Sequence, residues 1–226
     1  MAVGERIETD ENNFYSHIVP FYNNDYVING EKQAKVFMFT SFLPCQVLFR
    51  RKLFFDIGKI NERHIVNLDG LLWFTMSLKS DLAYIQDEVC IYRKHPNNTT
   101  SMYNKQINHM MEYYTTLLEM FKLAEDNNYL KQFFIDAEKR VALLTLRYCQ
   151  DVIRNEEYNL AKKYLILSTV FDEDIKDSKI YKIIEQTLKS NKINRFDLFQ
   201  KLIKDIPIQR KDSYSPPIGS KILKRK

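Results

Sequence analysis

The sequence predicts an α/β fold of mixed strands and helices that changes, near residue 103, into an all-α region. Before that point short apolar runs alternate with polar turns, whereas the later residues carry the apolar spacing of helices almost throughout. Glycine is scarce, with 5 residues in 226. A complete doubly wound nucleotide-binding domain uses more glycines in its tight turns, so we expect the α/β part to be incomplete.

Four elements follow one another in the first sixty residues. Residues 1–13 read as the end of a strand and a turn rich in Asp and Asn. Residues 35–43 fit either a short helix or a buried strand, because their apolar residues show no clear period. Residues 46–49 suit a buried strand, and residues 51–57 suit a short helix that Gly58 ends.

Asp69 precedes an apolar run of helical length and is a good N-cap residue, so we expect a helix to begin there. Residues 81–95 resemble two short strands around a turn, ending at Pro96.

The later residues predict five helices, and the second and third of these should form an antiparallel hairpin because their connection is very short. We place the helices at 105–126, 129–154, 156–170, 173–190 and 194–205. Pro207 should end the last one. We therefore divide the chain into an α/β part (1–103), a helical region (104–206) and a flexible basic tail (207–226).

Composition and charge exclude several classes of protein. Hydrophobic residues make up 45% of the chain, which is enough for a core without disulfides. Cys45, Cys90 and Cys149 lie far apart among apolar residues, and we expect buried free thiols. No secretory leader or spanning segment is evident, so we expect a cytoplasmic protein. The net charge of +5 is too mild and too interleaved with acids to favour nucleic-acid binding.

The last residues are the exception to the interleaving, since they hold basic side chains without acids: Lys221, Lys224, Arg225 and Lys226. Two alternatives remain for this tail. It contacts an anionic membrane surface at the inner face of the membrane, or it is a frayed end in solution.

Three segments carry the chemistry, and they stand in a fixed order. They are QVLFRRKLFFDIG (46–58), LDGLLWF (68–74) and DLAYIQDEVCIYRKH (81–95). Together, at these separations, they resemble the C-terminal half of family 2 glycosyltransferases of the GT-A fold, over about residues 40–101. The resemblance implies an incomplete GT-A-like half, on the acceptor side, followed by a helical region.

The resemblance places the family's catalytic acid–base residue at Asp69. Inverting glycosyl transfer needs a carboxylate that takes the proton of the acceptor hydroxyl as it attacks the anomeric carbon. A carboxylate in the first turn of a helix is favoured in its ionised form by the helix dipole. The alternative is that Asp69 only caps the helix. The chain departs from the family in having Leu68 where a second acid is common.

Arg93 and His95 match the family's closing Tyr-Arg-x-His, which implies a place beside the donor diphosphate and its metal. A guanidinium can bind phosphate oxygens in pairs, and a neutral imidazole can bind a divalent cation, so His95 is a candidate metal ligand. The alternative is a solvated loop before Pro96. Trp73 is a candidate for stacking on a sugar ring or, alternatively, a core residue.

The family's donor-binding Asp-x-Asp after an apolar strand is missing, and Asp172 to Asp174 read instead as helix-capping acids. We therefore expect a fragment or split half of an inverting hexosyl- or hexosaminyltransferase that acts on a cell-surface glycan or polysaccharide. It would need a separate donor-binding half for the nucleotide sugar and its Mn²⁺ or Mg²⁺. The alternative is a non-enzymatic helical module for protein interaction that carries a degenerate transferase remnant.

Overall fold

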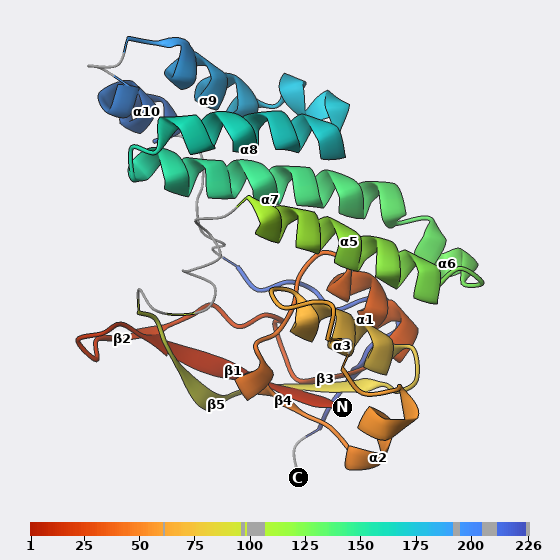
Figure 1. Ribbon diagram of the computed structural model, residues 1–226. Coiled ribbons are helices and arrows are strands. Elements are labelled where there is room, and N and C mark those ends of the chain that lie inside the picture. The colour runs from red at the N-terminus through yellow and green to blue at the C-terminus, as the bar shows by residue number, and fades with distance from the viewer. Residues whose placement is uncertain (61, 96–97, 99–106, 192–194, 205–211, 225–226) are drawn as a thin grey trace.

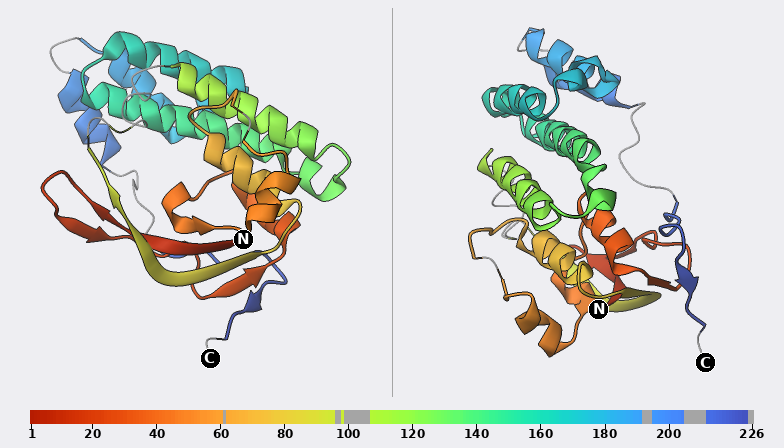
Figure 2. Two further views of the ribbon diagram at one scale, coloured as in Figure 1. Left: turned by 60° about the horizontal axis from the view of Figure 1, so that its bottom comes forward. Right: turned by 90° about the vertical axis from the view of Figure 1, so that its right-hand side faces the viewer.

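The computed structural model describes residues 1–60, 62–95, 98, 107–191, 195–204 and 212–224. It shows a curled mixed sheet with helices on one side, followed by a helical region, which confirms the predicted fold class. Figure 1 shows the layers in order: the sheet, then α1 and α3, then α5, α7, α8 and α9 stacked beyond them. The right-hand view of Figure 2 shows the same succession from the side.

The sheet is built around one parallel pair of strands. The described strands are β1 (Ala2–Thr9), β2 (Tyr15–His17), β3 (Tyr26–Ile28), β4 (Val47–Leu48), β5 (Leu82–Arg93) and β6 (Lys221–Ile222). Their order is β2-β1-β5-β3-β6, with β4 also paired to β1. β1 and β5 run parallel, from Ala2 beside Ala83 to Thr9 beside Arg93, and the other pairs are antiparallel.

The strand predicted at the start of the chain is confirmed, but the prediction of two short strands within residues 81–95 is wrong. β5 is one continuous strand of twelve residues. The polar residues in the middle of this segment suggested a turn. In the structure the strand continues through them but is irregular there. The backbone N–H of Gln86 donates to the carboxylate of Asp25 at 2.8 Å, and the register with β1 shifts close by.

Three helices belong to the α/β part: α1 (Gly30–Phe37), α2 (Arg51–Asp56) and α3 (Leu68–Ser77). α2 ends as predicted, with Gly58 in the left-handed region at φ 85°. The buried strand expected over 46–49 is wrong, since β4 lies at the sheet edge and Leu48 is 75% exposed. The N-cap of α3 is Asn67, and Asp69 is its second residue rather than its cap.

The helical region begins with α5, a long helix that packs on α3. Its described helices are α5 (Asn108–Leu123), α6 (Asn128–Lys131), α7 (Phe134–Arg154), α8 (Tyr158–Phe171), α9 (Lys179–Lys189) and α10 (Arg195–Ile203). The predicted hairpin is confirmed as α7 and α8, with Ala161 and Tyr164 fully buried between them. Asp172 caps a short 3-10 helix, Glu173–Asp177, as its position suggested.

The hydrophobic core runs without a break from the sheet into the helices. Tyr84 of β5, Phe74 of α3, Met110 of α5 and Leu146 of α7 are all fully buried members of one cluster. Because α3 lies between the sheet and α5, the helical region is an extension of the same core. Within the described residues, no helix is both long enough and apolar enough to cross a bilayer.

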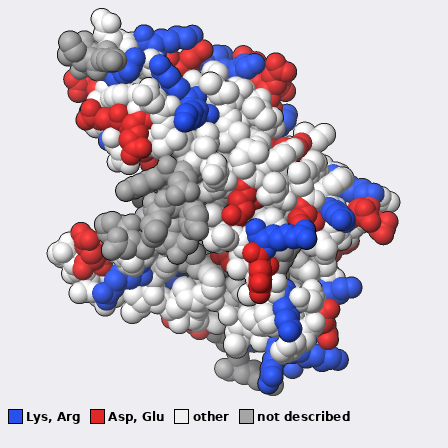
Figure 3. Space-filling view, in the orientation of Figure 1, with Lys and Arg blue, Asp and Glu red and all other residues white. Residues whose placement is uncertain are grey.

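Charged side chains are intermixed over the face seen in Figure 3, as the interleaved sequence suggested. Lys and Arg side chains appear at the lower end of this view, over α2, and also at its upper end, where acidic side chains lie among them.

The prediction of a flexible tail is wrong for residues 212–224. Tyr214 donates its N–H to the carbonyl of Phe21 at 2.8 Å and accepts from the N–H of Asn23 at 3.2 Å. β6 then pairs with β3, whose outer edge would otherwise leave its polar backbone groups unpaired. Pro207, Arg225 and Lys226 lie outside the described residues.

Removing residues 212–226 should therefore destabilise the protein by about 1–3 kcal/mol, because it breaks several backbone hydrogen bonds that each contribute about 1 kcal/mol. Thermal unfolding followed by circular dichroism measures this. A variant that ends at residue 224 keeps the strand and serves as the control. Equal melting temperatures for the two truncations would show that the returning segment does not stabilise the fold.

Candidate functional site

A cavity of about 440 Å³ lies where the helical region meets the α/β part. One wall consists of β1, β5, the start of α3 and the loop after α1, and the other consists of α5 and α7. Its polar lining residues come from all of these elements: Arg6, Thr40, Ser41, Asn67, Asp69, Tyr92, Tyr113, Arg140, Arg147 and Tyr148. The cavity thus gathers a carboxyl group, phenols and guanidinium groups from distant parts of the chain.

Asp69 lies half-buried in this lining, in the first turn of α3. Its Oδ1 accepts a hydrogen bond from the N–H of Gly70 at 2.8 Å. Burial raises the pKa of Asp69 to about 6, although backbone hydrogen bonds partly oppose the shift. A carboxylate whose pKa lies this close to neutrality is well matched to taking a proton from a hydroxyl group.

The Asn67 side chain packs closely against Gly70, the residue after Asp69. A Cβ atom at Gly70 would lie 2.5 Å from Oδ1 of Asn67, which is far inside van der Waals contact. Gly70 therefore lets the Asn67 side chain fold over the first turn of α3, where Asn67 also lines the cavity.

Glu112 of α5 holds the turn that leads to Asp69. Its Oε1 accepts hydrogen bonds from three successive backbone N–H groups, those of Ile65 at 2.5 Å, of Val66, and of Asn67 at 3.2 Å. Charged acceptors make hydrogen bonds that are roughly twice as strong as neutral ones. The helical region therefore fixes the position of the turn before α3.

Two tyrosines line the same cavity as Asp69, Tyr113 on α5 and Tyr148 on α7. Burial, the neighbouring Tyr148 phenol and the carboxylate of Asp69 raise the pKa of Tyr113 above its ordinary range. Because the Asp69 carboxylate affects the pKa of Tyr113, the two side chains lie close enough to interact electrostatically. Phenol hydroxyls both donate and accept hydrogen bonds, so this pair is suited to orienting a polyhydroxylated molecule.

Arg140 and Arg147 of α7 line the same cavity. Burial and the nearby Arg147 lower the pKa of Arg140 from its usual value. Arg140 donates through Nε to the carbonyl of Phe39 at 3.4 Å, a long bond to a neutral group. Within the described part of the chain, neither guanidinium forms an ion pair with a carboxylate.

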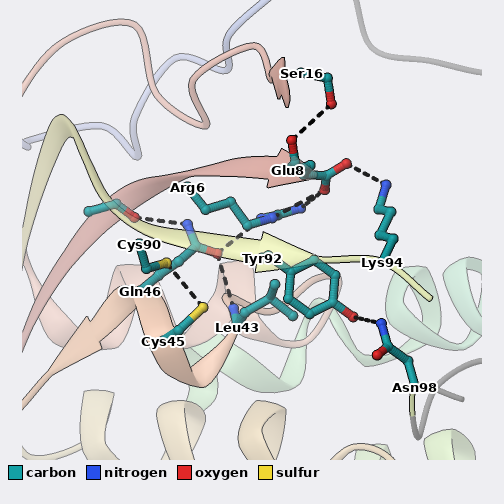
Figure 4. A network of polar contacts seen from close by, with 11 residues as sticks. Arg6, Glu8, Ser16, Leu43, Cys45, Gln46, Cys90, Tyr92, Lys94 and Asn98 are labelled. Atoms are coloured by element: carbon teal, nitrogen blue, oxygen red, sulfur yellow. Dashed lines mark hydrogen bonds and ion pairs between the residues drawn. The ribbon is translucent and has the colours of Figure 1, made fainter. Parts of the chain in front are cut away.

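Arg6 on β1 is held at the cavity edge by the polar network in Figure 4. It donates to Oε1 of Gln46 at 3.0 Å and to Oε1 of Glu8 at 2.8 Å. Lys94 also bonds Glu8, and although burial opposes ionisation, the bonds from Lys94 and Arg6 hold the pKa of Glu8 below its usual value. The charge of Arg6 is therefore already compensated within the protein.

The cysteines correct one expectation. Cys149 is buried as predicted, but Cys45 is exposed and Cys90 is half-buried. The Sγ atoms of Cys45 and Cys90 lie 3.0 Å apart in the network of Figure 4. Their distance in sequence hid this pairing, because a 3-10 helix (Pro44–Gln46) brings Cys45 beside β5.

Of the residues predicted from the sequence, Asp69 lies in the cavity and the other three do not line it. Trp73 is 2% exposed, and its Nε1 donates to the carbonyl of Phe42 at 3.0 Å. This burial leaves no ring face for a sugar. Of the two alternatives given for Trp73, a position in the core is therefore the correct one. Its indole supports the loop that forms part of the cavity wall.

Arg93 and His95 lie on and just after the end of β5, and both are exposed. Arg93 donates to the side chain of Asn13 at 3.0 Å. It points away from the face that carries Tyr92, because successive strand residues alternate. Among the described residues, no group of three or more His, Cys, Asp and Glu side chains forms a candidate metal site. The metal expected at His95 in the complete enzyme stays a prediction.

Sequence reasoning missed the helical side of the cavity. Arg140 and Arg147 are two helical turns apart on a helix with an apolar face. This spacing could have predicted that they lie on the same side of the helix. Glu112 carried no signal, since a glutamate within a helix is usually a solvated residue. No family model, no curated protein and no solved structure matches this chain. The resemblance to family 2 glycosyltransferases accordingly remains a hypothesis.

Replacing Glu112 with alanine should lower the free energy of unfolding by about 2–3 kcal/mol, because three backbone N–H groups lose a charged acceptor. Urea unfolding measures the change, and hydrogen exchange should show faster exchange at residues 65–67. Glu125→Ala removes an exposed glutamate from the same part of the chain and is the control. A loss no larger than that of the control would contradict the role given to Glu112.

Asp69 should also make stability depend on pH. Its pKa in the folded protein is about 6 against a usual 3.8. The contribution of Asp69 to the free energy of unfolding is therefore fully present below about pH 4 and is lost as the pH rises through 6. Asp69→Asn removes this loss, and its advantage over the wild type should grow by about 1–2 kcal/mol between pH 4 and pH 7, allowing for partial exposure. Thermal unfolding across this range, with Asp126→Asn as the control, tests it. A difference that does not change with pH would mean an ordinary pKa.

Proposed function

We propose that this chain forms the acceptor-binding and proton-abstracting part of an inverting, nucleotide-sugar-dependent glycosyltransferase. The observation that supports this most directly is the half-buried carboxyl group of Asp69, with a pKa of about 6, in a cavity lined by hydroxyl and guanidinium groups. The same residue occupies the acid–base position in the family resemblance. The geometry and the sequence motif thus both favour Asp69 as the general base.

In the proposed reaction, an acceptor hydroxyl lies against the Asp69 carboxylate. The carboxylate takes the proton while the acceptor oxygen attacks the anomeric carbon, and the bond to the nucleoside diphosphate breaks. Tyr113 and Tyr148 hold the acceptor sugar so that one hydroxyl faces the carboxylate. Glu112 keeps the Asp69 turn rigid, which preserves this alignment.

Donor binding requires residues beyond those described in the cavity. The chain has no Asp-x-Asp after an apolar strand, and Arg93 and His95 lie outside the cavity lining. We therefore propose that a complementary donor-binding segment supplies the nucleotide-sugar site, and we assign no step to a metal held by this chain.

The alternative of a helical interaction module with a degenerate remnant fits the cavity less well. In such a remnant Asp69 and His95 would not share a cavity, or the helices would cover Asp69. The first condition holds, since His95 lies outside the lining that contains Asp69, but the second does not. Instead, α5 and α7 contribute the second wall of the cavity and leave Asp69 half-buried beside it. This arrangement favours a binding site that uses the helical region.

The test combines the purified chain with the donor-binding half of a family 2 glycosyltransferase, a panel of nucleotide sugars and candidate glycans, and detects products by mass spectrometry. Transfer should fall by about 10²–10⁴-fold in Asp69→Asn, because the general base is lost. The wild-type rate should rise with pH through about 6 as Asp69 ionises. Asp126→Asn is the control, and near-normal turnover by Asp69→Asn would rule out the proposed base.

A further inference from the structure

The described lining of the cavity holds more basic than acidic side chains. Three arginines and one carboxyl group line its described part, and only Arg6 among the arginines is ion-paired. Asp151, one turn beyond Arg147 on α7, is already bonded to Arg154 at 2.5 Å. Arg140 is half-buried and Arg147 is exposed. Half-burying the Arg140 guanidinium without a carboxylate costs free energy, which a bound anion would offset.

The two remaining guanidinium groups occupy one stripe of α7. Arg140 and Arg147 are seven residues apart, which is two helical turns, or roughly 10 Å along the axis. Tyr148 and Tyr113 lie beside them, and Asp69 lies in the same lining. Arg147 lies close enough to Arg140 to lower its pKa, so one phosphate group can interact with both guanidinium groups while the molecule that carries it places a hydroxyl at Asp69.

We propose that Arg140 and Arg147 bind phosphate groups of the acceptor, so that the acceptor is a phosphate-bearing glycan rather than a neutral sugar. This inference rests on the proposed function, because it treats the cavity as the acceptor site. Arginine suits the task, since its planar guanidinium can make two parallel hydrogen bonds to a phosphate. The helical region then selects the acceptor, while α3 supplies the base.

The experiment measures binding to the full chain by isothermal titration calorimetry, with glycerol 3-phosphate, glycerol and UDP as separate probes. Glycerol 3-phosphate should bind and glycerol should not. Arg140→Gln and Arg147→Gln should each weaken this binding by about tenfold or more, because a charge-assisted contact is lost. Lys139→Gln removes the same charge from the same helix at an exposed position and should leave the affinity within about twofold.

Arg147 is exposed, so Arg147→Gln should fold even if Arg140→Gln does not. Binding that depends on Arg147 supports the phosphate site even where no transfer is detected, and missing transfer then counts against the proposed function alone. Binding of UDP without binding of glycerol 3-phosphate would overturn the inference, since the arginines would serve a nucleotide. Equal transfer to neutral and phosphorylated acceptors, unchanged in both arginine variants, would also overturn it while leaving the proposed function intact.

Discussion

The contact between one carboxylate of α5 and three backbone N–H groups governs the site. Glu112 accepts from Ile65, Val66 and Asn67, so the turn before α3 is held by a helix that follows it by more than forty residues. Without that acceptor, three successive amides at the edge of the core would need other partners. The position of Asp69 therefore depends on docking of the helical region, and the two parts of the chain form one working unit.

The same docking creates the cavity and its electrostatics. α5 and α7 bring phenol and guanidinium groups over the first turn of α3, and they remove enough water to raise the pKa of Asp69. A carboxyl group at a helix N-terminus would ordinarily be favoured in its ionised form. Here burial is the larger effect, so the dipole argument made from the sequence gave the wrong direction for the shift.

The sheet also contributes residues to the cavity. The parallel pair of β1 and β5 sets Arg6 and Tyr92 at the cavity edge, and the network around Glu8 and Gln46 fixes Arg6. Trp73 contributes from the core, where its indole N–H holds the loop after α1. The residues closest to the proposed chemistry are thus each supported by a buried or ion-paired neighbour.

The sequence by itself determined the fold class, the helical hairpin of α7 and α8 and the end of α2 at Gly58, because periodicity and capping are local properties. Only the tertiary structure decided that β5 is one strand, that Tyr214 and β6 return to the sheet, and that Cys45 meets Cys90. It also decided that Arg140 and Arg147 share a cavity with Asp69. These features depend on contacts between residues far apart in the chain, and local sequence patterns do not predict such contacts.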